Sequence, residues 1–144
     1  MTPSQEARSM KASVRRTDST FKHTVQVRDH QLTVDEPLES GGADSGPDPQ
    51  ELLAVSLASC TAITMEMYAA RKGWSIGKVE VEVQYSPAER GSPTKFDVLL
   101  RLPEDLPDNQ VERLRVIAEK CPVHRTLDGE VMFNEHVERS PAPV

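Results

Sequence analysis

Hydrophobic and polar residues alternate along several stretches of the chain, and this period of two predicts β-strands. Residues 11–35 predict two or three antiparallel strands, because the alternation is interrupted and then restarts. Later stretches each predict one further strand: residues 78–86, their antiparallel partner 95–102, and a closing strand at residues 129–138.

One long segment shows neither alternation nor charge. The run LLAVSLASCTAITM stays apolar or small until Glu66, which predicts a helix that is buried on most sides. Asp48 can cap this helix, Pro49 suits its first position, and Glu51 stands three residues after Asp48 as in a capping box. The basic residues and the glycine at residues 71–74 predict its end.

A second helix is predicted between Asp108 and Lys120, where four apolar residues recur at helical spacing: Val111, Leu114, Ile117 and Ala118. Residues 37–49 are dense in Gly, Pro, Asp and Ser, and they predict a long loop before the first helix. The order of strands, helix, two strands, helix and strand predicts an α+β fold rather than the regular alternation of a parallel α/β sheet.

The length of 144 residues suits one domain with one hydrophobic core. We expect this domain to span residues 11–138, with flexible tails at residues 1–10 and 139–144. Aromatic residues make up only 4% of the chain and hydrophobic residues 37%. A subunit this lean is expected to complete its core by forming a homodimer.

Charge and composition exclude several classes of partner. The 17 basic and 23 acidic side chains give a net charge of -6, and no run of Lys or Arg resembles a nucleic-acid binding patch. The N-terminal residues lack the apolar segment of a signal peptide, and no uncharged run has the length that a membrane span needs. We therefore expect a cytoplasmic protein that binds neither nucleic acid nor a membrane.

The chain has two cysteines, Cys60 in the first predicted helix and Cys121 in the sequence KCPVHRTL. In a reducing cytosol, a disulfide between them is expected to be transient and catalytic rather than structural. Burial in the middle of a helix should raise the pKa of Cys60, because desolvation disfavours the thiolate. Pro122 suits the first position of a short helix, so Cys121 is expected to cap it, where unpaired N–H groups favour a thiolate.

Cys121 and His124 form a C-x-x-H sequence that offers two possible zinc ligands. A structural zinc site needs four ligands, and the chain has no second cysteine pair, so we expect no metal. His124 is then either an aid to a thiolate or a helix-surface histidine that bonds to a neighbour.

Two segments resemble one known family. They are GGADSGPDPQELLAVSLASCTAITMEMYAARKGW at residues 41–74 and AEKCPVHRTLDGEV at residues 118–131, and they resemble the osmotically inducible protein C and organic hydroperoxide resistance (OsmC/Ohr) family. The resemblance implies an OsmC-like fold, in which antiparallel sheets wrap two central helices in an intertwined homodimer. It also implies thiol-dependent reduction of organic hydroperoxides without a metal, a flavin or another cofactor.

The resemblance also implies a role for each cysteine. Cys60 matches the peroxidatic cysteine of the family, which attacks the distal oxygen of the peroxide and becomes a sulfenic acid. Cys121 matches the resolving cysteine, which condenses with that sulfenic acid to a disulfide. An external dithiol would then restore both thiols.

The chain departs from the family pattern at the start of the first helix. The hydroperoxide-specific branch has a glutamate directly after the proline, which holds an arginine beside the peroxidatic thiol, and Gln50 occupies that position here. Glu51 follows, but nine helical residues place it about 13 Å along the axis from Cys60 and roughly opposite. Glu51 is therefore either a helix cap or a catalytic residue that acts through an arginine or a second subunit. Three arginines qualify by position: Arg15, Arg16 and Arg28.

Two functions are consistent with this sequence. The first is a thiol peroxidase that reduces organic hydroperoxides through Cys60 and Cys121. The second is a non-catalytic or redox-sensing protein on the same scaffold that binds a small apolar ligand. The pair of thiols favours the peroxidase, whereas Gln50 favours the binding protein.

Overall fold

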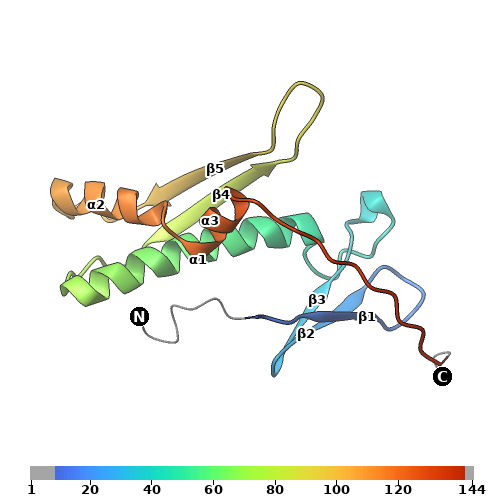
Figure 1. Cartoon of the computed structure of the whole chain (residues 1–144). Helices are drawn as coiled ribbons and strands as arrows, with labels where there is room; N and C mark the ends of the chain where they lie inside the picture. Colours follow the sequence, from blue (N-terminus) through green and yellow to red (C-terminus); the bar gives the residue numbers. More distant parts are fainter. Residues whose placement is uncertain (1–8, 142–144) are drawn as a thin grey trace. The chain divides into compact units, whose positions relative to one another are not determined.

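The computed structural model of the chain describes residues 9–141 (Figure 1). Residues 1–8 and 142–144, which belong to the two predicted tails, lie outside this range. The chain divides into two compact units, the first formed by Met1–Ser56 with Gln84–Asp97 and the second by Leu57–Val83 with Val98–Val144. The single domain over residues 11–138 stays a prediction.

The first unit contains a three-stranded antiparallel sheet, which confirms the strands predicted in residues 11–35. Its strands follow one another across the sheet: β1 (Ser13–Arg16), β2 (His23–Val27) and β3 (His30–Val34). The register places Val14 opposite Val25 and Val25 opposite Leu32, so these three side chains share one face. The opposite face carries an aligned polar row: Ser13, Gln26 and Gln31.

The loop predicted at residues 37–49 is confirmed, and it contains one turn of 3₁₀ helix, η2 (Leu38–Ser40). Gly41 follows η2 with a φ of 89°, in the left-handed region that glycine adopts most readily. A Cβ atom at Gly42 would lie 2.0 Å from the carbonyl oxygen of Glu36, so only glycine fits there without moving the backbone. These two glycines allow the chain to fold back tightly after β3.

The same loop is built around the carboxylate of Asp35, a residue only 1% exposed. The carboxylate accepts hydrogen bonds from the backbone N–H groups of Glu36 (2.7 Å), Ser45 (3.1 Å) and Ala43 (3.3 Å). It also accepts one from the Ser45 hydroxyl (2.6 Å). Hydrogen bonding, from the Ser45 hydroxyl above all, lowers the pKa of Asp35 from 3.8 to about 2.

This shift makes the contribution of Asp35 to stability depend on pH. The ionised carboxylate stabilises the folded chain above the unfolded pKa of 3.8, and the contribution is lost as the pH falls toward about 2. We expect Asp35→Asn to lower the free energy of unfolding near neutral pH and to approach the wild type as the pH falls through this window. Urea unfolding at a series of pH values measures the difference. Asp29→Asn, in the exposed β2–β3 turn, is the control, and a loss in Asp35→Asn that is constant with pH would contradict the prediction.

The long helix α1 (Pro49–Lys72) begins and ends where the sequence predicts. At its start, the Asp48 N–H donates to the Glu51 carboxylate (2.9 Å) and the Glu51 N–H donates to the Asp48 carboxylate (2.8 Å), which is the predicted capping box. At its end, Gly73 has a φ of 70°, and the Trp74 N–H bonds back to the Ala69 carbonyl oxygen (2.9 Å). Both ends of the helix thus satisfy backbone groups that would otherwise lack partners.

The prediction that α1 is buried on most sides is wrong for the single chain. Ile63 is 50% and Met67 60% exposed, because the elements of the second unit pack against one face of the helix. By length and composition alone α1 is also apolar enough to cross a membrane, contrary to the sequence expectation, although core helices of soluble proteins meet the same criterion. The buried face carries five residues: Leu57, Thr61, Met65, Tyr68 and Ala69.

The core of the second unit forms where α1 meets the second helix and the later strands (Figure 1). As predicted, β4 (Glu80–Ser86) and β5 (Lys95–Arg101) pair in a two-stranded antiparallel sheet, and they are followed by α2 (Asp108–Ala118). Side chains before β4, on α1 and on α2 make up the buried cluster: Met65, Tyr68, Ala69, Ile76, Leu114, Ile117 and Ala118.

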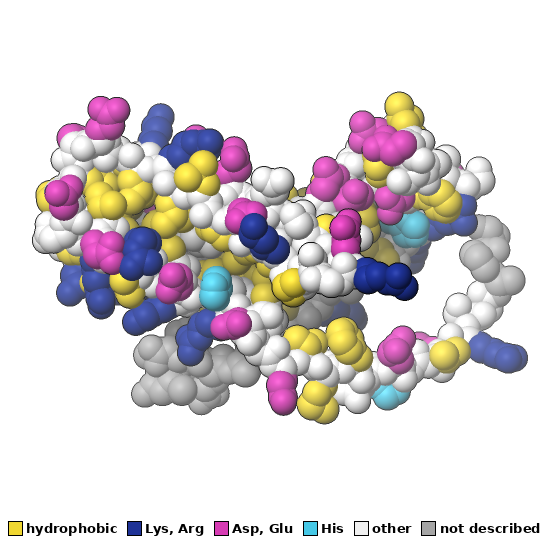
Figure 2. Space-filling view, turned by 90° about the horizontal axis from the view of Figure 1, so that it is seen from above, with side chains coloured by type: hydrophobic (Ala, Val, Ile, Leu, Met, Phe, Trp, Pro, Cys, Tyr) yellow, Lys and Arg dark blue, Asp and Glu magenta, His cyan; other side chains and the backbone are white. Residues whose placement is uncertain are grey.

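Two predictions for the C-terminal part of the chain have opposite outcomes. The short helix is confirmed as α3 (Pro122–Leu127), with Cys121 as its N-cap. The closing strand predicted at residues 129–138 is wrong, because the segment has no regular structure. A strand needs a neighbouring edge for its backbone hydrogen bonds, and no strand of the described chain pairs with this segment. Its apolar side chains are exposed, Phe133 by 83% and Val137 by 94%, and Figure 2 shows many hydrophobic side chains open to solvent.

Candidate functional site

Both cysteines lie in the second unit, where α3 packs beside the middle of α1 (Figure 1). Cys60 projects from α1, and Cys121 stands at the start of α3. Both thiols are free, and the Cys121 thiol is near enough to raise the pKa of Cys60. The fold thus brings together two thiols that are separated by sixty residues in the sequence.

Cys121 is fully buried and caps α3 with its sulfur atom. The backbone N–H of His124 donates to this sulfur at 3.2 Å, and the Thr61 hydroxyl lies 3.7 Å from it. Pro122 has no N–H, so the first donors of the helix are those of the next residues. The predicted cap is therefore confirmed in its geometry. Within residues 9–141, no group of three or more His, Cys, Asp or Glu side chains is arranged to hold a metal ion.

Cys60 is half-buried, so part of its side chain stays accessible. Burial raises the pKa of the Cys60 thiol, as predicted for a cysteine in the middle of an apolar helix, and the Cys121 thiol raises it further. Hydrogen bonds from the Val123 backbone N–H and the Thr64 side chain lower this pKa, but they do not cancel the effect of burial. Efficient attack by Cys60 at neutral pH therefore needs a further positive charge.

Glu51, the third predicted site residue, lies in the first turn of α1 and belongs to the first unit. Its carboxylate is engaged in the capping box with Asp48. Gln50, which stands where the hydroperoxide-specific branch has glutamate, is exposed. The capping role of Glu51 is confirmed, and its catalytic role stays a prediction.

The three candidate arginines all belong to the first unit. Arg15 and Arg16 lie on β1, and Arg28 lies in the β2–β3 turn with a φ of 52°. The Arg16 guanidinium donates hydrogen bonds to the carbonyl oxygens of Ser19 (2.5 Å) and Thr20 (2.6 Å). Arg16 is therefore engaged by the loop that follows its own strand.

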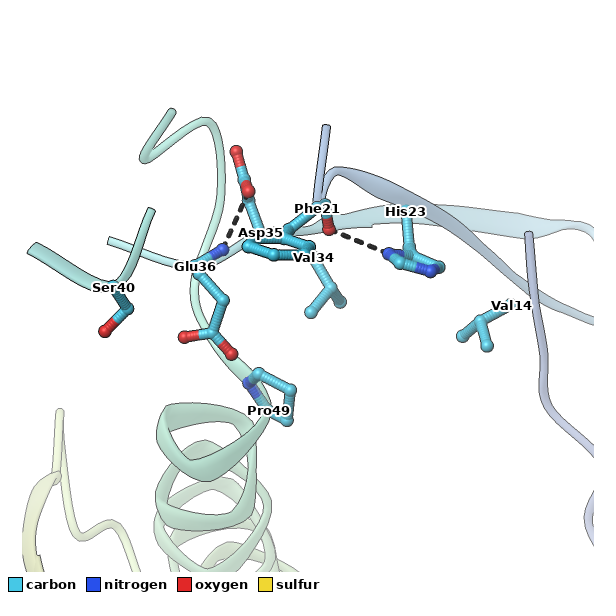
Figure 3. A pocket seen from close by; sticks show the side chains of 8 residues that line it. All are labelled: Val14, Phe21, His23, Val34, Asp35, Glu36, Ser40 and Pro49. Atoms are coloured by element: carbon cyan, nitrogen blue, oxygen red, sulfur yellow. Dashed lines mark hydrogen bonds between the residues drawn. The ribbon is translucent and has the colours of Figure 1, made fainter. Parts of the chain in front are cut away.

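The first unit has a cavity of about 640 Å³ on the apolar face of its sheet (Figure 3). Figure 3 shows Val34 and Glu36 above Pro49, with His23 and Val14 farther along the strands. The lining is largely apolar, with an imidazole and two carboxylates among it, and it includes neither cysteine. Eight residues form it: Val14, Phe21, His23, Val34, Asp35, Glu36, Ser40 and Pro49.

The chain matches one known protein family over more than half of its length. The family described as OsmC-like protein matches residues 41–136, a segment that includes α1, both cysteines and α3. The chain belongs to the OsmC-like family. No curated protein matches the chain.

Solved structures share the fold of this OsmC-like protein at low sequence identity. The OsmC-like protein of Mycoplasma pneumoniae is 20% identical, with a TM-score of 0.67 over 87% of this chain and 89% of that chain. The organic hydroperoxide resistance protein OsmC of Legionella pneumophila is 23% identical, with a TM-score of 0.63 over 87% and 93%. The organic hydroperoxide resistance protein OhrB of Bacillus subtilis is 22% identical, with a TM-score of 0.58 over 85% and 92%.

Two groups that contact the thiols in this OsmC-like protein could not be predicted from the sequence. Thr61 follows Cys60 directly, but within the apolar run it looks like one more small residue of the core. The Val123 N–H is a backbone group, and only Pro122 hints that the residue after it carries the first free donor of α3. Both contacts depend on how α3 packs on α1, which no local pattern encodes.

Proposed function

We propose that this OsmC-like protein is a thiol peroxidase that reduces organic hydroperoxides through Cys60 and Cys121. The observation that carries the proposal is the pairing of a half-buried thiol on α1 with a fully buried thiol at the start of α3. A peroxide can reach Cys60, whereas Cys121 has a neighbouring sulfur as its natural reaction partner. Two proteins of this fold are described as organic hydroperoxide resistance proteins, which supports the choice of substrate class.

The proposed reaction has three steps. The Cys60 thiolate attacks the distal oxygen of the hydroperoxide, the O–O bond breaks, and the alkoxide takes a proton and leaves as an alcohol. The Cys121 sulfur then attacks the sulfenic acid of Cys60, an S–S bond replaces the S–O bond, and the hydroxyl leaves as water with the proton of Cys121. An external dithiol finally exchanges with the disulfide, becomes oxidised itself, and restores both thiols.

The first step needs Cys60 as a thiolate, which its burial opposes. We propose that an arginine, from this chain or from a second subunit, supplies the further positive charge that Cys60 needs. The choice lies between Arg15 and Arg28, because Arg16 already bonds to loop carbonyls.

Glu51 enters the proposal as a residue that orients this arginine rather than as one that touches Cys60. Its bond to the Asp48 N–H is the competing role, and it leaves the second carboxylate oxygen of Glu51 for the arginine.

We also propose that the protein works as a homodimer in the cytoplasm. The exposed apolar side chains of α1 and of residues 129–138 support a homodimer, because a second copy would remove this surface from water.

Two free thiols suit a reducing compartment such as the cytoplasm, where a dithiol reductant is at hand. The net charge of -6 supports the absence of nucleic acid among the partners.

Mass spectrometry tests the proposal. When the reduced protein is treated with cumene hydroperoxide, we expect the mass of each chain to fall by two hydrogen atoms and digestion to yield a peptide pair linked through Cys60 and Cys121. Spectra recorded under native conditions should correspond to two chains. If both thiols stay reduced in the presence of the peroxide, the protein is not a peroxidase and the ligand-binding function becomes the better proposal.

A further inference from the structure

Thr61 places a buried hydroxyl between the two helices that carry the thiols. Its side chain is 2% exposed and lies on the inner face of α1, directly after Cys60 in the sequence. The oxygen atom Oγ1 lies 2.8 Å from the carbonyl oxygen of Leu57 and 3.7 Å from the sulfur of Cys121. The hydroxyl thus contacts the backbone of its own helix on one side and the cap of α3 on the other.

The chemistry of these groups fixes the direction of both hydrogen bonds. A hydroxyl has a single proton, and a carbonyl oxygen can only accept, so Thr61 donates its proton to Leu57. The contact with sulfur must then be a hydrogen bond from the Cys121 S–H to Oγ1 of Thr61. Because the Cys121 sulfur accepts from the His124 N–H at the same time, the buried thiol is held from two sides.

We infer that Thr61 is a positioning residue for Cys121, an inference that rests on the proposed peroxidase function. The hydroxyl holds the Cys121 sulfur against α1, one residue from the Cys60 that it must attack. A valine at this position has nearly the same shape but no acceptor, so the thiol would lose its fixed orientation and a buried S–H would lose its partner. Thr61 therefore acts on the second step of the reaction, disulfide formation, and not on the attack of Cys60 on peroxide.

The S–H bond of Cys121 takes part directly in disulfide formation, because it must break when the S–S bond forms. When the Cys121 sulfur attacks the sulfur of oxidised Cys60, an S–S bond forms and the S–O bond breaks. The S–H bond of Cys121 breaks as well, and its proton, until then hydrogen-bonded to Oγ1 of Thr61, departs with the hydroxyl as water. Thr61 itself gains and loses nothing, because its own proton stays on the bond to Leu57.

Thr61→Val and Thr61→Ser form a matched pair of variants, the first without the hydroxyl and the second with it. Each reduced protein is mixed with cumene hydroperoxide in a single turnover, quenched with acid, and analysed by mass spectrometry. We expect Thr61→Val to slow disulfide formation about fivefold and to leave more Cys60 as sulfinic acid at excess peroxide. The rate of the first oxidation should stay unchanged, and Thr61→Ser should restore the rate of disulfide formation.

An unchanged rate of disulfide formation in Thr61→Val, or an equal loss in Thr61→Ser, would overturn the inference. A wild-type protein that peroxide does not oxidise would overturn the peroxidase proposal instead. A spectroscopic measurement keeps the two apart, because Cys121 is the only thiol left in a Cys60→Ser background. Its S–H stretching band should lie at lower frequency with the Thr61 hydroxyl than in Thr61→Val, and coincident bands would refute the contact.

Discussion

Cys60→Ser is expected to lose peroxide consumption, with a rate lower by about three orders of magnitude or more. Serine has almost the same shape as cysteine, but its hydroxyl does not ionise near neutral pH and its oxygen is a poor nucleophile toward the O–O bond. Peroxide consumption with a dithiol as reductant measures the effect, and circular dichroism shows whether the fold is kept. A variant that consumes peroxide at the wild-type rate would remove Cys60 from the reaction.

Cys121→Ser is the matched control, because it removes the second thiol and leaves the first. We expect the first oxidation of Cys60 to proceed, the disulfide to be absent, and Cys60 to advance to sulfinic acid when peroxide is in excess. This split follows from the burial of the two residues, since Cys60 is half-buried and Cys121 is not exposed at all. If Cys121→Ser prevents the first oxidation and Cys60→Ser permits it, the two roles are reversed.

Leu114→Ala is expected to cause the second large effect, a loss of about 2–5 kcal/mol in the free energy of unfolding. Leu114 is 0% exposed and lies in the core cluster of the second unit, where α2 packs against Met65 and Tyr68 of α1. Removing its branched end takes apolar surface out of the core and leaves a cavity that neighbouring side chains fill only in part.

Urea unfolding of Leu114→Ala beside Leu38→Ala measures this effect against a matched leucine. Leu38 is 71% exposed in η2, so its truncation should change the free energy of unfolding by less than about 0.5 kcal/mol. Equal losses in the two variants would mean that the core of the second unit does not centre on Leu114.

Much of the secondary structure follows from the sequence, because local patterns encode it. The capping box of Asp48 and Glu51, and the glycine turn at Gly73, mark both ends of α1 as predicted. Local patterns do not, however, tell which part of the protein covers each apolar surface. The apolar run of α1 predicts burial on most sides and residues 129–138 predict a strand, yet both lack a covering partner in the described chain. Such patterns indicate which surfaces are to be buried, but the partner that buries them need not belong to the same chain.

The candidate site also has features that the sequence predicts and one contact that it does not. Pro122 signals a helix start, so the cap by Cys121 was predictable, and the apolar surroundings of Cys60 signal its raised pKa. The contact between Thr61 and Cys121 was not predictable, because it depends on the packing of α3 against α1 rather than on a sequence pattern.

The loop between β3 and α1 is closed at its base by a backbone hydrogen bond. Besides the bonds to its carboxylate, the Asp35 N–H donates to the carbonyl oxygen of Pro47 (3.2 Å), one residue before Asp48 caps α1. This hydrogen bond holds the two ends of the loop together, and η2 forms the exposed tip between them. A peptide tag inserted at the tip would lengthen the loop at little entropic cost and leave the start of α1 where it is.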